Sequence, residues 1–209
     1  MINVTHIVGI DEVGRGPLAG PIAFCACVVA HGFDYGHLEG IKDSKKLSPQ
    51  KRAEWFHKLS AMKAVGTMNF SYVEVPADKI DSMGLPWAIE RAIHECLDTL
   101  HAAEALDPQI TQVFLDGSLR APKKFVLQET IIKGDEKVPV IAAASIFAKV
   151  MRDRYMEEQA KVYPQYGFDA HKGYGTAAHL LAIRKHGLTP IHRRSFLSKV
   201  TGTAVVVRG

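Results

Sequence analysis

Apolar and polar positions along the chain follow the two spacings that distinguish strands from helices. Nearly continuous apolar runs at residues 7–10 and 21–30 predict two buried strands, antiparallel to each other through the glycine-rich segment between them. Residues 67–75 alternate polar with apolar side chains, which predicts a strand near a sheet edge with one face in solvent. Residues 110–115 predict another apolar strand, and residues 130–133 are also typical of β structure.

Helical signals separate these strands along the chain. Ser48 and Pro49 are a typical cap and first-turn residue, and apolar residues recur at helical spacing from residue 85. The predicted helices lie within residues 49–62, 76–82, 85–100, 138–156 and 176–186. Strands interleaved with helices indicate an α/β domain with a mixed sheet.

The composition is that of one globular domain with a mild basic excess. The 209 residues, 47% of them hydrophobic, suffice for a single core, and the net charge of +4 suits an anionic partner without proving one. Cys25, Cys27 and Cys96 form no ligand-spaced cluster, which favours a reducing cytoplasm. No signal peptide or membrane-spanning run is recognisable. We expect a soluble, cytoplasmic monomer with a flexible tail at residues 201–209.

Four acidic residues stand where apolar segments meet turns. Asp11 and Glu12 follow the first apolar run, Asp116 follows residues 110–115, and Asp135 lies in a glycine-containing turn. Such residues can converge at one edge of a sheet, where their mutual repulsion would raise their pKa values unless hard cations bound. Oxygen ligands favour Mg²⁺ or Mn²⁺ over Zn²⁺, and two such ions support in-line phosphoryl transfer. The alternative is that these acids are solvated turn residues, which is the commoner use of an isolated acid pair.

Glycines and basic residues provide candidate contacts for an anionic ligand. Gly14 and Gly16 lack the side chains that would keep a sugar or phosphate from the main-chain N–H groups, and Arg15 lies between them. Lys45 and Lys46 could hold a phosphate, although a solvated loop with lysines is equally consistent with this composition. Aromatic, glycine and basic residues are interleaved in the last third of the chain, which is typical of a nucleic-acid-binding surface.

Several short motifs follow one another in order along most of the chain. They are GIDEVGRGPLAGP at residues 9–21, DSKKLS at 43–48, DG at 116–117, KGD at 133–135, AASIFAKV at 143–150 with RD at 152–153, HKGYGT at 171–176 and HRRSF at 192–196. Any one of them could arise by chance. The whole series, from about residue 7 to residue 196, resembles the ribonuclease HII family, the type 2 ribonucleases H.

The resemblance implies a ribonuclease H-like fold, in which helices flank a mixed central sheet, with a helical, substrate-binding C-terminal extension at about residues 160–200. It also implies hydrolysis of the RNA strand of RNA–DNA hybrids, and cleavage 5′ of ribonucleotides embedded in duplex DNA. Two Mg²⁺ or Mn²⁺ ions would take part, and the products would carry 3′-hydroxyl and 5′-phosphate ends. The family's metal-binding, catalytic acids fall on Asp11, Glu12, Asp116 and Asp135. Its substrate-binding loop falls on Gly14, Arg15 and Gly16, and its junction-sensing tyrosine on Tyr174.

The departures from the family pattern are few. Val13 stands where the family usually has alanine, Ala142 where it often has serine, and residues 81–87 lack the usual asparagine-containing helix start. The first two replace no acid, and the third bears on a helix boundary rather than on the chemistry. The sister family, ribonuclease HIII, would bring an additional N-terminal domain, and the first motif here begins within a few residues of Met1, so we favour HII. A sliding-clamp peptide, expected as a glutamine followed by paired aromatics, is absent from residues 201–209.

Two other functions are consistent with these residues. A non-catalytic nucleic-acid-binding module would keep the basic surface, but it would gain nothing from carboxylates placed beside phosphates. A metal-dependent nuclease of related fold without ribose preference would keep the acids, and it would also cut an all-DNA duplex.

Overall fold

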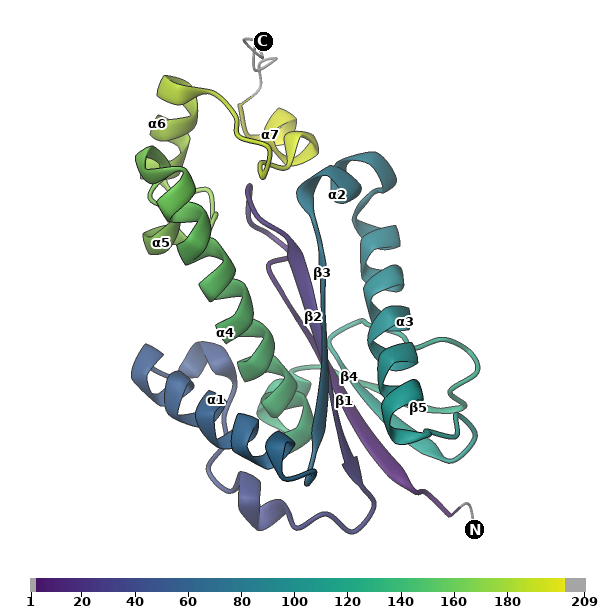
Figure 1. Cartoon of the computed structure of the whole chain (residues 1–209). Coiled ribbons are helices and arrows are strands. Elements are labelled where there is room, and N and C mark those ends of the chain that lie inside the picture. The colour runs from purple at the N-terminus through teal and green to yellow at the C-terminus, as the bar shows by residue number, and fades with distance from the viewer. Residues whose placement is uncertain (1–2, 202–209) are drawn as a thin grey trace. The chain divides into compact units, whose positions relative to one another are not determined.

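The strands of the computed structural model, which describes residues 3–201 of the chain, form one five-stranded sheet in the order β3-β2-β1-β4-β5 (Figure 1). β1 pairs antiparallel with β2 and parallel with β4, and β4 pairs parallel with β5. The strands are β1 (His6–Val13), β2 (Ile22–Ala30), β3 (Asn69–Val75), β4 (Thr111–Asp116) and β5 (Leu127–Ile131). The predicted mixed sheet is therefore confirmed, and so is the edge position of β3.

The five predicted helices are present in the predicted order, and two further helices, α5 (Phe168–His171) and α7 (Arg194–Thr201), lie outside the predicted ranges. The five predicted helices are α1 (Pro49–Ala64), α2 (Ala77–Met83), α3 (Leu85–Glu104), α4 (Pro139–Val162) and α6 (Ala177–His186). α1 begins at the predicted Pro49, where the Ser48 hydroxyl accepts a hydrogen bond from the Lys51 N–H at 3.2 Å. Short 3₁₀ helices lie at Tyr35–Leu38, Ser44–Lys46, Gly134–Glu136 and Pro164–Tyr166. None of the helices in the described part of the chain is long and apolar enough to cross a membrane.

Some element boundaries differ from the predicted ones. β1 continues through Asp11 and Glu12 to Val13, because its backbone ladder with β2 extends to the pair Val13 and Ala23 whatever the polarity of the side chains. α4 ends at Val162 rather than near residue 156, since the polar residues that follow Met156 are good helix formers without an apolar pattern. The two acids therefore lie inside a strand, which fixes their backbone more firmly than a turn would.

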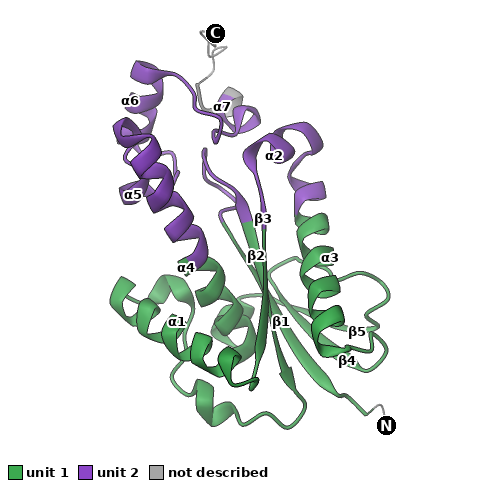
Figure 2. Ribbon diagram, in the orientation of Figure 1, with its two compact units in different colours: residues 1–13, 23–73, 89–150 green, residues 14–22, 74–88, 151–209 purple. Residues whose placement is uncertain are grey.

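The chain divides into two compact units (Figure 2). Unit 1 comprises residues 1–13, 23–73 and 89–150, and unit 2 comprises residues 14–22, 74–88 and 151–209. Residues 160–200 belong to unit 2, although a single domain and a substrate-binding extension stay predictions. The expected flexible tail at residues 201–209, and the clamp peptide sought there, lie beyond Thr201 outside the described residues.

Close backbone packing holds β1 against the start of α4 in unit 1. A Cβ atom on Gly9 would lie 2.4 Å from the Val140 carbonyl carbon and 2.5 Å from the Ile141 nitrogen, so no other residue fits there. Ala143 and Ala144 are completely buried in the same helix. The small residues of α4 thus bring its first turns directly over the strand that carries Asp11 and Glu12.

Unit 2 has an apolar core of its own. Its members include Leu18, Met156, Phe168, Ile183 and Leu197. Leu18 belongs to the loop of residues 14–21 and is 5% exposed, so this loop is anchored by burial even though Arg15 and Gly16 are exposed. The rigid part of the loop therefore frames an exposed tip.

Candidate active site

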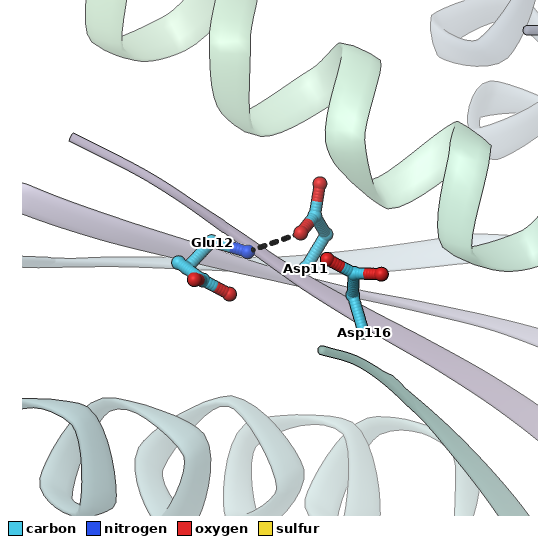
Figure 3. A group of neighbouring side chains, drawn as sticks. All are labelled: Asp11, Glu12 and Asp116. Carbon is cyan, nitrogen blue, oxygen red and sulfur yellow. Dashed lines mark hydrogen bonds between the residues drawn. The ribbon is translucent and has the colours of Figure 1, made fainter. Parts of the chain in front are cut away.

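Two neighbouring parallel strands carry three of the acids that the sequence singled out. Ile10 of β1 is paired with Leu115 of β4, so the next residues, Asp11 and Asp116, lie side by side at the same edge of the sheet. One carboxylate oxygen each from Asp11, Glu12 and Asp116 lies within 4.8 Å of the others (Figure 3). Such a group of oxygens can hold a hard divalent cation.

Asp11 is the most buried member of this group, with 4% of its surface exposed. The pKa of Asp11 is raised to about 8. Burial is the largest cause, a hydrogen bond from Ser145 opposes it, and the charges of Glu12 and Asp116 add to it. The Glu12 N–H also donates to Asp11 Oδ1 at 2.8 Å. Three carboxylates at this spacing repel one another, so a cation among them would favour their ionised forms.

Asp135 lies next to the three-acid group rather than within it. It belongs to the 3₁₀ helix Gly134–Glu136, whose Gly134 N–H donates to Asp116 Oδ1 at 2.6 Å. The preceding Lys133 has a left-handed backbone, with φ of 55°. Burial, the largest cause, and the charges of Asp43 and Asp116 together raise the pKa of Asp135 to about 6. The predicted convergence of four acids is thus a tight group of three, with the fourth beside Asp116.

Asp43 and Ser145 are parts of this site that sequence reasoning missed. Asp43 is 6% exposed and accepts a hydrogen bond from the Lys45 N–H at 2.8 Å. The hydroxyl of Ser145, on α4, bonds to Asp11 and lies 2.9 Å from the hydroxyl of Ser44. Asp43 is the first residue of the DSKKLS motif, whose lysines predict phosphate binding, and nothing in the motif marks the aspartate as a neighbour of the acid group.

The two predicted phosphate-binding lysines have different surroundings. Lys46 makes an ion pair with Glu136 at 2.7 Å. Burial would lower the pKa of Lys45, but attraction to Asp11 and to the other acids of the site outweighs it, so this pKa is raised. Lys45 is therefore a cation next to the acid group, whereas Lys46 already has a partner in the protein.

Gly14 and Gly16 are glycines for different reasons. Gly14 has φ of 82°, and a Cβ atom there would lie 2.1 Å from Arg152 Nε, so the fold itself requires glycine. Gly16 is outside the left-handed φ region, and a Cβ atom there would meet nothing within 4 Å. Nothing in the packing of residues 3–201 explains why residue 16 lacks a side chain.

Tyr174 is exposed rather than part of the core. Its exposed fraction is 44%, and its N–H donates to the His171 carbonyl at 2.9 Å in a tight turn. The preceding Gly173 accepts hydrogen bonds from the Leu18 N–H at 2.9 Å and the Ala19 N–H at 3.3 Å. The turn that carries Tyr174 and the loop of residues 14–21 are therefore joined within unit 2, whereas the acids belong to unit 1.

Comparison with known proteins identifies relatives along nearly the whole chain. The family model of ribonuclease HII matches residues 8–199. Ribonuclease HII of Shouchella clausii is 45% identical over 191 residues, which are 91% of this chain and 68% of that protein. The crystal structure of ribonuclease H2 from Pyrococcus horikoshii superposes with a TM-score of 0.71 at 25% identity and covers 94% of this chain and 97% of that one. Bst-RNase HIII, solved in complex with Mn²⁺, has the same fold, with a TM-score of 0.66 at 19% identity over 97% of this chain and 72% of that one.

Proposed function

The chain belongs to the ribonuclease HII family, and from that premise we propose that it cuts the RNA strand of RNA–DNA hybrids and cuts 5′ of ribonucleotides embedded in duplex DNA. The products would carry 3′-hydroxyl and 5′-phosphate ends. The observation that carries this proposal is the alignment of two parallel strands that brings carboxylate oxygens of Asp11, Glu12 and Asp116 within 4.8 Å of one another.

The residues of this group fit a divalent metal. Their donors are all carboxylate oxygens, the ligands that Mg²⁺ and Mn²⁺ prefer, and the most buried of them has its pKa raised by burial and by its acidic neighbours. Asp11, Glu12 and Asp116 would hold the ions, with Asp135 beside them. When bound, two such ions would stabilise negative charge on the attacking and leaving oxygens of the phosphodiester.

The chain's own residues would orient the substrate around this site. The ammonium group of Lys45 lies in the field of the acids and would bind a backbone phosphate. Ser145 holds one carboxylate oxygen of Asp11 by its hydrogen bond, and Gly134 holds one of Asp116. These bonds fix the directions in which the remaining oxygens point.

Ribose recognition would use Gly14, Arg15, Gly16 and Tyr174. An exposed glycine with no packing reason leaves room for a sugar to reach the main chain, and a 2′-hydroxyl can both donate and accept a hydrogen bond. The exposed ring of Tyr174 could pack on the neighbouring sugar, and its hydroxyl could bond to the 2′-hydroxyl. Together these groups would recognise the junction between a ribonucleotide and the neighbouring deoxyribonucleotide.

We also infer that the protein works in the cytoplasm as a monomer. Cys25, Cys27 and Cys96 are free and buried, which supports a reducing compartment. Two alternatives to the main proposal are a nuclease of related fold without ribose preference and a non-catalytic nucleic-acid-binding module.

One assay tests the proposal against both alternatives. The protein is incubated with Mg²⁺ and with duplexes that carry no ribonucleotide, one ribonucleotide or a full RNA strand, and the cut positions and end groups are mapped. We expect cleavage of the second and third duplexes only, with a 3′-hydroxyl on the upstream product. Comparable cleavage of the all-DNA duplex would favour the related nuclease, and tight binding without any cleavage would favour the binding module.

A further inference from the structure

A completely buried arginine in unit 2 holds the backbone of the loop that contains Gly14 and Gly16. The guanidinium of Arg193 is 0% exposed and donates to three main-chain carbonyls, those of Gly14 at 2.7 Å, Arg15 at 3.1 Å and Gly20 at 2.9 Å. Burying a cation costs several kcal/mol of solvation unless hydrogen bonds replace the lost water. A side chain that served only to fill space would need no charge here.

The carbonyls that Arg193 holds determine where the opposite sides of their peptides point. In a trans peptide the C=O and the N–H point in opposite directions, and the described residues include no cis peptide. The peptide that contains the Gly14 carbonyl also contains the Arg15 N–H, and the next contains the Arg15 carbonyl and the Gly16 N–H. Because Arg193 holds two successive carbonyls, the N–H groups of Arg15 and Gly16, at the exposed tip of the loop, point away from the guanidinium.

The backbone beside Arg193 is joined to the same loop. The Arg193 N–H donates to the Leu18 carbonyl at 2.8 Å, and the Ile191 carbonyl accepts from the Gly20 N–H at 2.9 Å. The segment Ile191–Arg193 therefore contacts the loop through two main-chain bonds in addition to the guanidinium.

His192, the middle residue of this segment, is connected to Tyr174 by hydrogen bonds through His179. His192 Nδ1 accepts from the Thr189 N–H at 2.9 Å, so its proton lies on Nε2, which is 3.1 Å from Nε2 of His179. His179 in turn donates from Nδ1 to the Tyr174 carbonyl at 2.9 Å. The main-chain N–H of Thr189 can only donate, and the Tyr174 carbonyl at the other end can only accept. Both histidines are therefore neutral, and each has one possible tautomer.

We infer that Ile191–Arg193 is a positioning segment for sugar recognition, and that Arg193 determines specificity without touching the substrate. Arg193 aims the N–H groups of Arg15 and Gly16, while His192, through His179, holds the backbone of Tyr174. The glycine loop and Tyr174, which would contact ribose, are thereby held in fixed positions relative to each other within unit 2. This inference rests on the proposed role of Gly14–Gly16 and Tyr174 in ribose recognition.

The test measures discrimination by binding, so that it does not depend on turnover. Asp11→Asn serves as a non-cleaving background, and the Kd is measured by fluorescence anisotropy for two duplexes that differ in a single 2′-hydroxyl. We expect the background protein to prefer the ribose duplex. Adding Arg193→Lys should reduce this preference at least about fivefold and leave the Kd of the deoxyribose duplex unchanged, because one ammonium group cannot bond to three separated carbonyls at once.

A matched core variant separates positioning from general stability. Leu97→Ala removes a completely buried side chain from α3 in unit 1, and it should lower the melting temperature while leaving the ratio of the two Kd values intact. If Arg193→Lys also lowers the melting temperature without changing that ratio, Arg193 is merely structural and the inference is wrong. If the Asp11→Asn background shows no preference for ribose, the proposed recognition itself fails, which is a different and recognisable result.

A second variant carries the test if Arg193→Lys does not fold. His192→Phe keeps an aromatic ring against Tyr166 and Phe168 but breaks the chain to His179. Its loss of ribose preference should overlap with that of Tyr174→Phe, so that the double variant loses little more than either single variant. Fully additive losses would contradict the inference.

Discussion

Asp11 is almost completely buried and lies beside two other acids. Replacing its carboxylate should therefore lower activity but should not lower stability. We predict that Asp11→Asn, and likewise Asp116→Asn, lowers the cleavage rate at least about 10³-fold, which corresponds to roughly 4 kcal/mol of transition-state stabilisation. Without added metal, the melting temperature of Asp11→Asn should equal or exceed that of the unmodified protein, because an amide removes the repulsion from Glu12 and Asp116. Single-turnover kinetics and thermal unfolding measure the two effects. Glu90→Gln, at an exposed acid, is the control; substantial cleavage by both site variants would contradict the metal assignment.

Tyr174 offers two separable contacts, a hydroxyl group and a ring. With 44% of the residue exposed, its replacement should leave folding intact. We predict that Tyr174→Phe loses part of the activity on a duplex with a single ribonucleotide, and that Tyr174→Ala loses more, since the ring itself stacks on a sugar. Comparing kcat/KM for both variants on that duplex checks this order. Wild-type rates in both variants would leave recognition to the glycine loop alone.

The residues of the candidate site differ in how far the sequence could reveal them. Asp11, Glu12 and Asp116 interrupt apolar runs, and a carboxylate at the end of a buried strand is conspicuous. The bond between Ser44 and Ser145 joins residues 101 positions apart, and no local pattern reports such a pairing. The ion pair of Lys46 with Glu136 could not be predicted from the sequence either, although it distinguishes Lys46 from the adjacent Lys45.

At the level of elements, two glycines of one motif should respond to the same substitution in opposite ways. Gly9→Ala places a methyl group 2.4 Å from the backbone of α4, and we predict a loss of at least about 3 kcal/mol in the free energy of unfolding. Gly16→Ala meets no atom within 4 Å, so stability should change by less than about 0.5 kcal/mol while cleavage at a single ribonucleotide falls roughly tenfold or more. Denaturant unfolding and kcat/KM measure the contrast. A stable Gly9→Ala, or an active Gly16→Ala, would refute the corresponding half.

The kinds and order of the elements were readable from the sequence, whereas several of their ends were not. The apolar run of β2 is buried from Ile22 to Val29, and burial on both faces of a strand produces the continuous pattern that predicted it. The end of β1 was misjudged because a backbone ladder continues beneath polar side chains. Residues 14–22 and 74–88 belong to unit 2 together with residues 151–209. Local patterns could not show this grouping, because it depends on contacts between residues far apart in the sequence.

For the whole molecule, the raised pKa values of the acids predict how metal and pH combine. Burial holds the pKa of Asp11 at about 8 against an ordinary 3.8, so the folded protein binds more protons than the unfolded chain between these values. Stability without metal should therefore fall as the pH rises toward 8. This fall in stability is best measured above pH 6.5. There His179 and His192, whose pKa values are lowered from 6.5 to about 4, are neutral in the folded protein and largely neutral in the unfolded chain. Mg²⁺ should raise the melting temperature more at pH 8 than at pH 5, and an equal effect at both would contradict the site.

The basic excess of the molecule predicts salt-dependent binding in which neighbouring lysines differ. Each phosphate contact contributes roughly 0.9 to the slope of log affinity against log salt concentration. Lys45→Ala should flatten this slope by about that amount, whereas Lys46→Ala should change it less, because Lys46 is paired with Glu136 at 2.7 Å. Anisotropy titrations on one duplex at several salt concentrations give both slopes. An unchanged slope for Lys45→Ala would make Lys45 an ordinary solvated lysine.

The hydrogen bond from Arg193 to Gly14 joins residues 179 positions apart, so it can form only late in the synthesis of the chain. Ribosomes add roughly 5–20 residues per second, so the glycine loop emerges roughly ten to forty seconds before the arginine that orients it. All segments of unit 1 end by residue 150, ahead of the last segment of unit 2. A nascent chain would therefore assemble its carboxylates before it could distinguish one sugar from another.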